Sequence, residues 1–234
     1  MKFAVIPARA GSKRIKKKNI RHFGGRPMIS WAIELAKKSQ LFDKIIVSTD
    51  ADEIAQIALQ YGADVPFLRP AEISGDKVDT ISVIKHAVDW HSTSWDGKDH
   101  LCCLYPTTPF LSADDLQQGL QSLLQTKATF SFAAAEFPHP VQRAMRVDDD
   151  GFYKLVNKTN AQTRSQDLEA LFYDVGQFYW GSVNSWKNEN VILGNDSCAA
   201  RIPKFRAIDF DTEEDWQRAE WLLKAKQASG EGLQ

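Results

Sequence analysis

Residues 4–19 read Ala-Val-Ile-Pro-Ala-Arg-Ala-Gly-Ser-Lys-Arg-Ile-Lys-Lys-Lys-Asn, and this stretch decides the expected fold. The apolar residues 3–6 are typical of a buried central strand. Pro7 ends that strand, because proline has no N–H to donate to a neighbouring strand. A loop containing Gly11 and Ser12 follows at once. The stretch therefore predicts a buried strand that opens into a glycine-containing loop.

Positive charge is concentrated in this loop. Eight of the eighteen residues 9–26 are Arg or Lys, in a chain whose net charge is only −1. Such a run is usually a solvated surface. Here it follows the C-terminal end of a predicted strand, where open α/β sheets bind ligands. It matches neither the P-loop nor the dinucleotide-binding pattern. We favour a polyphosphate cradle of backbone N–H groups and lysines over a solvated loop.

Length and composition are those of a globular domain. The 234 residues, 43% hydrophobic and 25% charged, suffice for one domain with a substantial core. No apolar run approaches membrane-spanning length, no N-terminal signal pattern is present, and three cysteines suit a reducing compartment. The basic run also lacks interleaved aromatic residues. We expect a single cytoplasmic domain over residues 1–234 that binds neither nucleic acid nor a membrane.

Apolar periodicity predicts alternating strands and helices in the first half of the chain. The expected elements are strands at 44–48, 65–68 and 101–105, and helices from Pro27 to about residue 38, at 54–61, at 81–91 and after Ser112. Ser112 and Asp115 form a capping-box pattern. Alternation of this kind is typical of a mostly parallel sheet with helices on both faces.

The pattern changes after residue 128. The expected elements are a strand at 129–135, a hairpin of 141–147 with 152–156, a polar loop at 157–167 and an aromatic strand at 171–180. This unit is not covered by helices, so its exposed aromatic residues need a partner surface. The chain then returns to the core over 199–210. Thr212 and Asp215 cap a final helix, and residues 229–234 are expected to fray.

Motifs along the chain resemble, in order, those of the cytidylyltransferases that activate ulosonic acids. The matching stretches are 7–14, 18–19, 25–29, 47–50, 68–70, 105–109 and 208–212. Ordered matches over nearly the whole chain are more specific than any single motif. The resemblance implies a three-layer α/β nucleotidyltransferase, Rossmann-like and GT-A-like, with a mostly parallel sheet. It also implies a homodimer formed through a small extension, which we place at about residues 136–172.

The resemblance also implies a reaction: CMP passes from CTP to the anomeric hydroxyl of a nonulosonic acid, and pyrophosphate leaves. No Ser-His-Asp or Cys-His nucleophile pair is suggested, so we expect direct in-line attack on the α-phosphorus. Arg9, Lys13 and Asp211 are the expected catalytic residues, and either Asp211 or an oxygen held by the metal could accept the hydroxyl proton. The positions that match the family's nucleotide-binding residues are Ala8, Arg9, Ser12, Lys13, Lys18, Asn19, Arg69, Val78 and Thr80.

Asp209 and Asp211 are the expected metal ligands. Residues two apart on a strand point to the same side, and hard cations prefer carboxylate oxygens. Acidic residues also favour helix N-termini, which explains those at 213–215 but not Asp209, outside the helix. Spacing and resemblance together predict a shared Mg²⁺ or Mn²⁺ site.

The identity of the sugar depends most on Tyr105. Sialate-activating relatives carry glutamine at this position, and a phenol replaces the amide's donor and acceptor with a flat apolar surface. A site built for one hydrogen-bonding pattern rejects another strongly. The resemblance implies these sugar-binding residues: Tyr105, Gln142, Arg143, Arg164, Gln166, Gln177 and Tyr179. Those on the extension would reach the partner's sugar pocket.

Three further stretches, 102–105, 138–143 and 163–180, look most like the pseudaminic acid cytidylyltransferases within the family. The chain departs from that pattern at Ala10, Lys16 and Thr108, which are small differences in loops. We expect pseudaminic acid as the substrate, with N-acetylneuraminate or another ulosonic acid as the alternative.

Two other classes of protein fit the predicted sheet. A glycosyltransferase of similar topology would carry paired aspartates after the fourth strand, where residues 105–109 contain no acid. A catalytically silent nucleotide-binding subunit would have lost phosphate-binding residues, whereas Arg9, Lys13 and Asp211 are all present. An assay of pyrophosphate release would separate both from a cytidylyltransferase.

Overall fold

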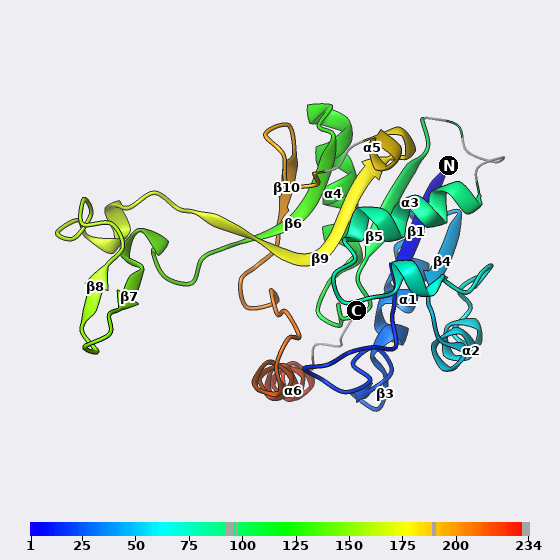
Figure 1. Ribbon diagram of the computed structural model, residues 1–234, viewed down its shortest axis with the longest axis horizontal. Helices are drawn as coiled ribbons and strands as arrows, with labels where there is room; N and C mark the ends of the chain where they lie inside the picture. The colour runs from blue at the N-terminus through cyan, green and yellow to red at the C-terminus, as the bar shows by residue number, and fades with distance from the viewer. Residues whose placement is uncertain (92–95, 97, 189–190, 231–234) are drawn as a thin grey trace.

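The computed structural model describes residues 1–91, 96, 98–188 and 191–230, and shows a layered body from which one arm projects (Figure 1). A six-stranded sheet lies at its centre, in the order β10-β6-β9-β5-β1-β4. Its strands are β1 (Lys2–Pro7), β4 (Lys44–Ser48), β5 (His100–Leu104), β6 (Phe130–Glu136), β9 (Phe172–Ser182) and β10 (Cys198–Arg201). The helices are α1 (Met28–Ser39), α2 (Asp52–Gln60), α3 (Thr80–Trp90), α4 (Ala113–Thr126), α5 (Val183–Asn188) and α6 (Glu213–Ala228).

The sheet is mostly parallel, as the alternation of elements predicts. Strand β1 pairs in parallel with both β4 and β5, and β10 pairs in parallel with β6. The one reversed strand is β9, which is antiparallel to β5 and β6 on either side. Residue Val5 stands opposite Ile46 on one side and Cys103 on the other, so β1 is fully enclosed. The short strands β2 (His22–Phe23) and β3 (Arg26–Pro27) form a separate pair.

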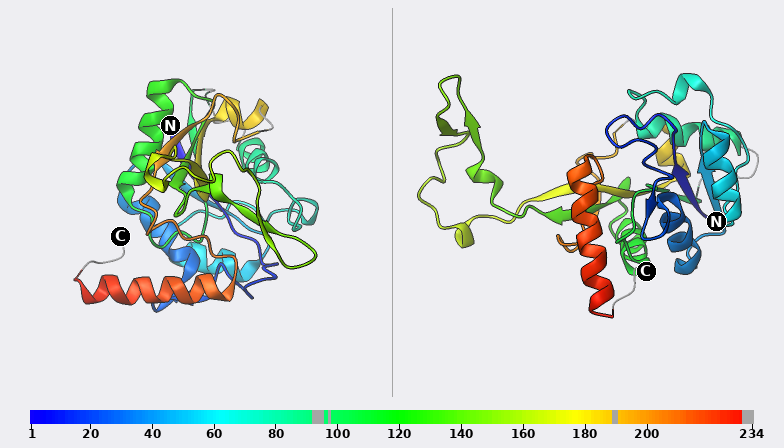
Figure 2. Two further views of the ribbon diagram at one scale, coloured as in Figure 1. Left: turned by 90° about the vertical axis from the view of Figure 1, so that its left-hand side faces the viewer. Right: turned by 90° about the horizontal axis from the view of Figure 1, so that it is seen from below.

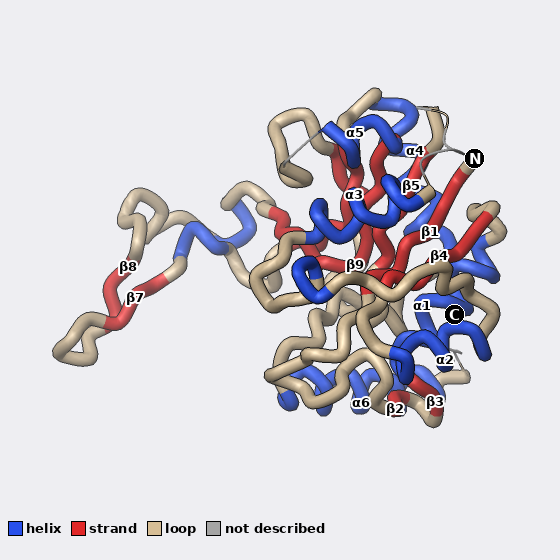
Figure 3. The backbone as a smooth tube through the Cα atoms, turned by 45° about the vertical axis from the view of Figure 1, so that its right-hand side comes forward, coloured by secondary structure: helices blue, strands red, loops and turns tan. Residues whose placement is uncertain are grey.

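Helices cover both faces of the sheet (Figure 3). One face packs against apolar residues of α1, α2 and α4, and the other against those of α3 and α5. Cys102 belongs to the first cluster and Cys103 to the second, because neighbours on a strand point to opposite faces. Burial raises the pKa of both thiols, so these cysteines fill the core as neutral groups. A third cluster, around Phe23 and Trp216, attaches α6 to the body.

Most of the predicted elements are confirmed, and three details are corrected. Residues 65–68 form no strand: Asp64 and Leu68 make isolated bridges to β4 and Thr49, and Pro66 has no N–H for a ladder. Pro27 occupies the N-cap of α1, one residue before the first helical position. Asp209 and Asp211 do not lie on a strand, since β10 ends at Arg201 and α6 begins at Glu213.

Both predicted capping boxes are present, at Ser112 with Asp115 before α4 and at Thr212 with Asp215 before α6. In each box the hydroxyl accepts from the backbone of the third helical residue, and that residue's carboxylate accepts from the cap. Of the predicted frayed tail, residues 231–234 lie outside the described part of the chain. No helix within the described residues is long and apolar enough to cross a membrane.

The arm is the segment 137–171, between β6 and β9, and it extends away from the sheet (Figures 1 and 2). It contains the predicted hairpin, in which β7 (Met145–Val147) pairs with β8 (Tyr153–Leu155). Two 3₁₀ turns, Val141–Arg143 and Ser165–Asp167, flank the hairpin. The hairpin exposes a group of large apolar side chains to solvent: Met145, Val147, Phe152, Tyr153 and Val156.

Candidate nucleotide-binding and catalytic site

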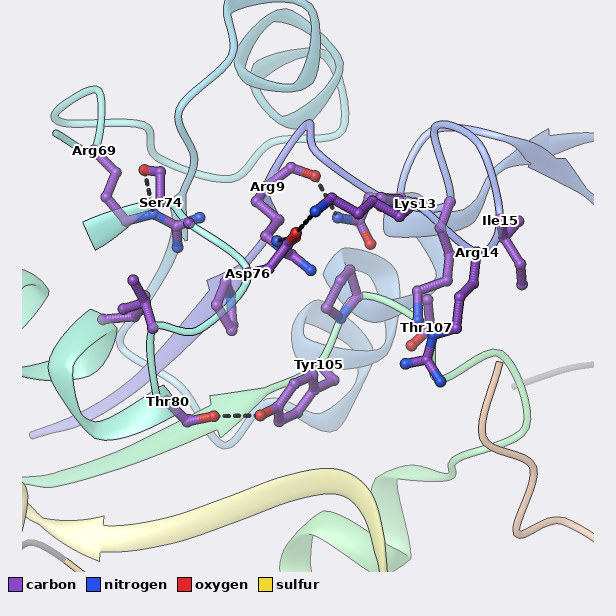
Figure 4. Close-up of a pocket in the computed structure, with 18 of the residues that line it drawn as sticks. Arg9, Lys13, Arg14, Ile15, Arg69, Ser74, Asp76, Thr80, Tyr105 and Thr107 are labelled. Carbon is purple, nitrogen blue, oxygen red and sulfur yellow. Dashed lines mark hydrogen bonds and ion pairs between the residues drawn. The ribbon is translucent and has the colours of Figure 1, made fainter. Parts of the chain in front are cut away.

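A pocket opens beyond the C-terminal ends of β1 and β5, the edge at which an open α/β sheet binds ligands (Figure 4). Its walls come from the basic loop after β1, the segment 69–80 before and at the start of α3, and residues 105–107 after β5. All of the expected nucleotide-binding residues except Ala8 line it: Arg9, Ser12, Lys13, Lys18, Asn19, Arg69, Val78 and Thr80. Ala8 is fully buried, and its backbone N–H donates to the Ser48 carbonyl at 2.9 Å.

Hydrogen bonds within the basic loop decide which cations face the pocket. The Asn19 side chain, which is only 5% exposed, donates to the Arg9 carbonyl at 3.0 Å and so closes the loop on itself. Lys17 adopts a positive φ of 53° and turns its ammonium toward α2, where it lies 2.7 Å from Glu53. Lys13 and Arg9 line the pocket instead. The lysines of this run are therefore not equivalent.

Each pocket-facing cation of the loop has a carboxylate or carbonyl partner. Arg9 and Lys13 both form ion pairs with Asp76 (Figure 4). Arg14 makes a bidentate pair with Asp211, with both N–O distances at 2.8 Å. Lys18 donates to the Phe210 carbonyl at 2.7 Å. Hydrogen bonds from Lys13 and Arg9 lower the pKa of Asp76, so its carboxylate is ionised.

The opposite end of the pocket is built around a buried guanidinium. Arg69 is 5% exposed, and its Nε donates to the Ser74 hydroxyl at 3.2 Å. Ser74 in turn donates to the Pro70 carbonyl at 2.8 Å, which fixes the turn that holds both residues. Burial lowers the pKa of Arg69, and Asp50 partly offsets that effect. A partly desolvated guanidinium of this kind is a strong hydrogen-bond donor for a planar ligand.

The two predicted metal ligands lie close enough to interact, but only Asp211 lines the pocket. Loss of solvent and the neighbouring charge of Asp211 raise the pKa of Asp209. Asp209 is nevertheless exposed to solvent. The described residues contain no cluster of three or more His, Cys, Asp or Glu side chains that could hold a metal ion without further ligands.

The sugar-binding candidates fall into two separate groups. Tyr105 lines the pocket and shares a hydrogen bond with Thr80. Tyr179 packs edge-on against it, with ring centroids 5.9 Å apart, and donates to Asp174 at 2.6 Å. Burial raises the pKa of both phenols, so both are neutral. Gln177 is buried beside them, and its Nε2 lies 3.4 Å from the Arg206 carbonyl.

The other sugar-binding candidates lie on the arm and do not line the pocket: Gln142, Arg143, Arg164 and Gln166. Two of them are tied to other parts of the arm. Gln142 donates to the Glu169 carbonyl at 2.8 Å, and Arg143 donates to the Thr163 carbonyl and to the Ser165 hydroxyl. The structure of one chain therefore does not bring these residues together with Tyr105.

Sequence reasoning missed two features of the site. Asp76 stands beside Gly75 in a segment that the resemblance covered only at its ends, so nothing marked it as a partner of Arg9. Arg206 makes a bidentate ion pair with Asp115 and also donates to the Phe110 carbonyl at 3.0 Å. Asp115 was recognised as a helix cap, but a partner 91 residues away leaves no local signal.

Comparison with known proteins identifies the family to which the chain is similar. Residues 3–180 match a family model described as cytidylyltransferase. The pseudaminic acid cytidylyltransferase of Campylobacter jejuni is 38% identical over 96% of this chain and 97% of its own length. The N-acylneuraminate cytidylyltransferase of Escherichia coli is 26% identical over 95% of this chain and 52% of its own length. The fold is also similar to that of CMP:2-keto-3-deoxy-manno-octonic acid synthetase, solved with CTP, with a TM-score of 0.69 at 16% identity, covering 96% of this chain and 99% of that one.

The layered sheet is similar to that of the solved synthetase, and the basic loop after β1 lies beside the pocket. The match of residues 3–180 to the family model and the 38% identity to the Campylobacter jejuni protein identify the family. The chain belongs to the cytidylyltransferase family.

Proposed function

We propose that this chain transfers CMP from CTP to the anomeric hydroxyl of pseudaminic acid, giving the CMP-sugar and pyrophosphate. The observation that carries the proposal is the convergence of Arg9, Lys13 and Asp211 on one pocket whose wall includes Tyr105. The 38% identity to a pseudaminic acid cytidylyltransferase supports the choice of sugar. Family membership argues against a glycosyltransferase, and the retained pocket residues argue against a silent subunit.

Cationic side chains of this chain would bind the triphosphate and stabilise the charge that develops on it. Arg9 and Lys13 come from the same loop and can bind neighbouring phosphate oxygens, with the guanidinium offering two parallel donors. Charge moves toward the leaving pyrophosphate as the anomeric oxygen attacks the α-phosphorus. Positioned cations stabilise that charge more in the transition state than in the bound substrate. Arg69, at the far end of the pocket, is placed to hold the cytosine.

The residues present fit a divalent cation. Mg²⁺ is commonly bound through one or two carboxylates, with substrate phosphates and water completing its coordination. Asp209 and Asp211 supply two carboxylates, and they lie close enough that loss of solvent together with the charge of Asp211 raises the pKa of Asp209. When bound, Mg²⁺ or Mn²⁺ would neutralise charge on the phosphate oxygens. Asp211 also lines the pocket, so it is the carboxylate placed to accept the hydroxyl proton.

Tyr105 would form the wall that selects the sugar, supported by the buried Tyr179, which packs against it. Their rings meet edge to face, and the bond from Tyr179 to Asp174 fixes the second ring in place. This presents flat apolar surface where an amide would present a donor and an acceptor. Such a wall suits a sugar with an extra methyl and a second acylamino group better than one with a glycerol tail.

The arm would complete the site in a homodimer. It extends from the body and exposes large apolar side chains, among them Phe152 and Tyr153 at 68% and 74%. Exposed apolar surface of this kind marks an interaction site. Arg143, Arg164 or Gln166 would then reach the sugar pocket of the partner. The cytoplasm, where CTP is available, is the compartment we expect for this reaction.

The test is a pyrophosphate-release assay of the purified protein with each nucleoside triphosphate and a panel of nonulosonic acids. We expect activity with CTP and pseudaminic acid, and little or none with N-acetylneuraminate. A preference for N-acetylneuraminate in direct competition would overturn the choice of sugar. Absence of pyrophosphate release with CTP and every sugar would overturn the reaction.

Two substitutions sharpen the assignment of the sugar. Tyr105→Gln should lower kcat/KM for pseudaminic acid about tenfold, because the site then presents the wrong polar pattern. Tyr105→Phe is the matched control: it keeps the ring and removes the hydroxyl bonded to Thr80. It should keep the preference between the two sugars. Equal loss of preference in both variants would contradict a role for the ring.

A further inference from the structure

The Asp76 carboxylate bridges Arg9 and Lys13, the two cations that the proposed reaction needs to bind phosphate. Asp76 pairs through one oxygen with Arg9 and through the other with Lys13, and Figure 4 shows it between them. Its side chain is 33% exposed, so the contact is made at the open side of the pocket. Asp76 belongs to the segment between the 3₁₀ turn Ala71–Ile73 and α3.

Carboxylate and phosphate oxygens compete for the same donors. Arg9 and Lys13 keep further N–H donors, but a phosphate bound to both would bring its negative charge against the Asp76 carboxylate, so the two anions compete for this pair of cations. The neighbouring pair of Lys17 with Glu53 does not stand in the way, because it lies on the side of the loop that faces α2.

We propose that Asp76 holds the place of a phosphate group in the empty site, and that binding of a triphosphate expels it. Asp76 thereby becomes a residue that sets nucleotide affinity. This inference rests on the proposed function for the identity of CTP as the ligand, but not for the competition between anions.

The segment that carries Asp76 is fixed at both ends. On one side, Ser74 is bonded to Arg69 and to the Pro70 carbonyl. On the other, Asp79 caps α3 by accepting from the Ser82 backbone N–H at 2.8 Å. Movement of Asp76 is therefore confined to residues 75–78, where the only backbone bond between residues of the segment joins Val78 N–H to the Gly75 carbonyl at 3.3 Å.

The same segment also lines the base end of the pocket. Ser74, Gly75, Val78 and Thr80 all contribute to its wall, on the side where Arg69 lies. Ser74 and Thr80 would contact the cytosine or ribose, and the bonds at both ends of the segment keep them in place when Asp76 is expelled. A complete nucleotide replaces both sets of contacts, whereas inorganic triphosphate breaks the Asp76 pairs without filling the base end.

The experiment measures affinity by isothermal titration calorimetry for CTP, inorganic triphosphate and cytidine, without divalent cations. Asp76→Asn removes the competing charge, and Glu53→Gln removes an equal charge from α2, where Glu53 pairs with Lys17 of the basic loop. Asp76→Asn should tighten CTP and inorganic triphosphate by about fivefold, the scale set by two partly exposed ion pairs. Cytidine affinity should stay unchanged, and Glu53→Gln should alter none of the three by more than about twofold.

Hydrogen–deuterium exchange separates expulsion from simple charge repulsion. Inorganic triphosphate should raise the exchange of backbone amides in residues 74–79 of the unaltered protein, because the segment loses its ion pairs. In Asp76→Asn the exchange should already be high and should not rise further. Unchanged or reduced exchange in the unaltered protein would overturn the inference.

Three affinity results would also overturn it: weaker CTP binding by Asp76→Asn, no change on that substitution, or an equal gain from Glu53→Gln. If the unaltered protein binds CTP but shows one of these results, the inference alone fails. If it binds inorganic triphosphate but not CTP, the proposed function fails, and tighter triphosphate binding by Asp76→Asn still supports the inference.

Discussion

The pocket and the arm differ in how far contacts with the rest of the chain hold them in place. At the pocket, Asn19 closes the basic loop by donating to Arg9 at 3.0 Å, and Lys18 donates across the fold to Phe210 at 2.7 Å. Outside the pocket lining, Arg206 donates to Phe110 and Asp115 at 2.6 to 3.0 Å. The arm is held by a hairpin of three paired residues on each strand, two short turns and hydrogen bonds within the arm itself, and it exposes Phe152 and Tyr153. The side chains that line the pocket are held in place by one chain, whereas the arm exposes large apolar side chains.

The same division separates the sugar-binding candidates. Tyr105, Gln177 and Tyr179 lie on or beside the central sheet, where neighbouring strands fix them. Gln142 and Arg143 are fixed only relative to the rest of the arm. Catalysis depends on geometry held before the substrate arrives. We therefore expect substitutions at the pocket to remove chemistry, and substitutions on the arm to act through assembly.

The largest effect is expected at Asp211, the proposed metal ligand that lines the pocket. Asp211→Asn should reduce kcat by about 10³-fold, because it would remove the proposed metal ligand and its charge from the pocket. The thermal midpoint should change little, since Asp211 is about one-third exposed and its partner Arg14 can be solvated. Steady-state kinetics and thermal melts measure both. Full activity of the unaltered enzyme in excess EDTA would remove Asp209 and Asp211 from this role.

The next largest effect is expected at Lys13, and Lys17 of the same loop serves as its comparison. Lys13→Ala should lower kcat/KM for CTP about 10²-fold, because a charge aimed at the phosphates is lost. Lys17→Ala should be close to neutral, since its ammonium pairs with Glu53 on the outer side. Initial rates over a range of CTP concentrations measure both variants. Equal losses would mean that the loop acts as a diffuse basic surface.

A substitution on the arm should act on the oligomeric state before it affects the kinetics. Tyr153→Asp places a charge on its most exposed aromatic position and should convert a dimer to monomers, measured by light scattering. The kcat/KM for the sugar should then fall by at least about tenfold, because groups from the partner leave the pocket. CTP affinity should stay the same, since the side chains that line the pocket belong to one chain.

Trp221→Asp is the control for the arm variant. Trp221 is 60% exposed on α6 and does not lie on the arm. It should leave both the oligomeric state and the kinetics unchanged. A protein that is monomeric and fully active before any substitution would contradict the division between pocket and arm.

Local pattern predicted most of the elements, although not α5 or the β2–β3 pair, and many of the residues that line the pocket followed from the resemblance. The strand at residues 44–48 and both capping boxes depend on neighbours in sequence, so periodicity and spacing predict them. The strand expected at 65–68 fails at Pro66, a local signal that the apolar run obscured. Pairs such as Arg206 with Asp115 depend on tertiary packing and leave no periodic trace.

The smallest effect is expected at Arg206, which holds the segment leading to Asp209 and Asp211. Its guanidinium makes a bidentate pair with Asp115 at 2.6 and 2.9 Å, and the side chains of both residues are largely buried. Arg206→Lys keeps the charge but cannot form both bonds in one plane. The segment would then lose its fixed position relative to α4, and the two aspartates would shift with it.

Arg206→Lys should therefore lower kcat by about fivefold, less than the ten- to hundredfold loss that removal of such a supporting partner causes. CTP affinity measured by calorimetry should not change, because Arg206 does not line the pocket. Lys204→Met is the matched control on the same segment, since Lys204 is exposed and reaches Glu136 only at 4.0 Å. It should behave like the unaltered enzyme. A parallel loss of CTP affinity in Arg206→Lys, or an equal fall in kcat in Lys204→Met, would show that Arg206 supports the fold in general and does not position the aspartates.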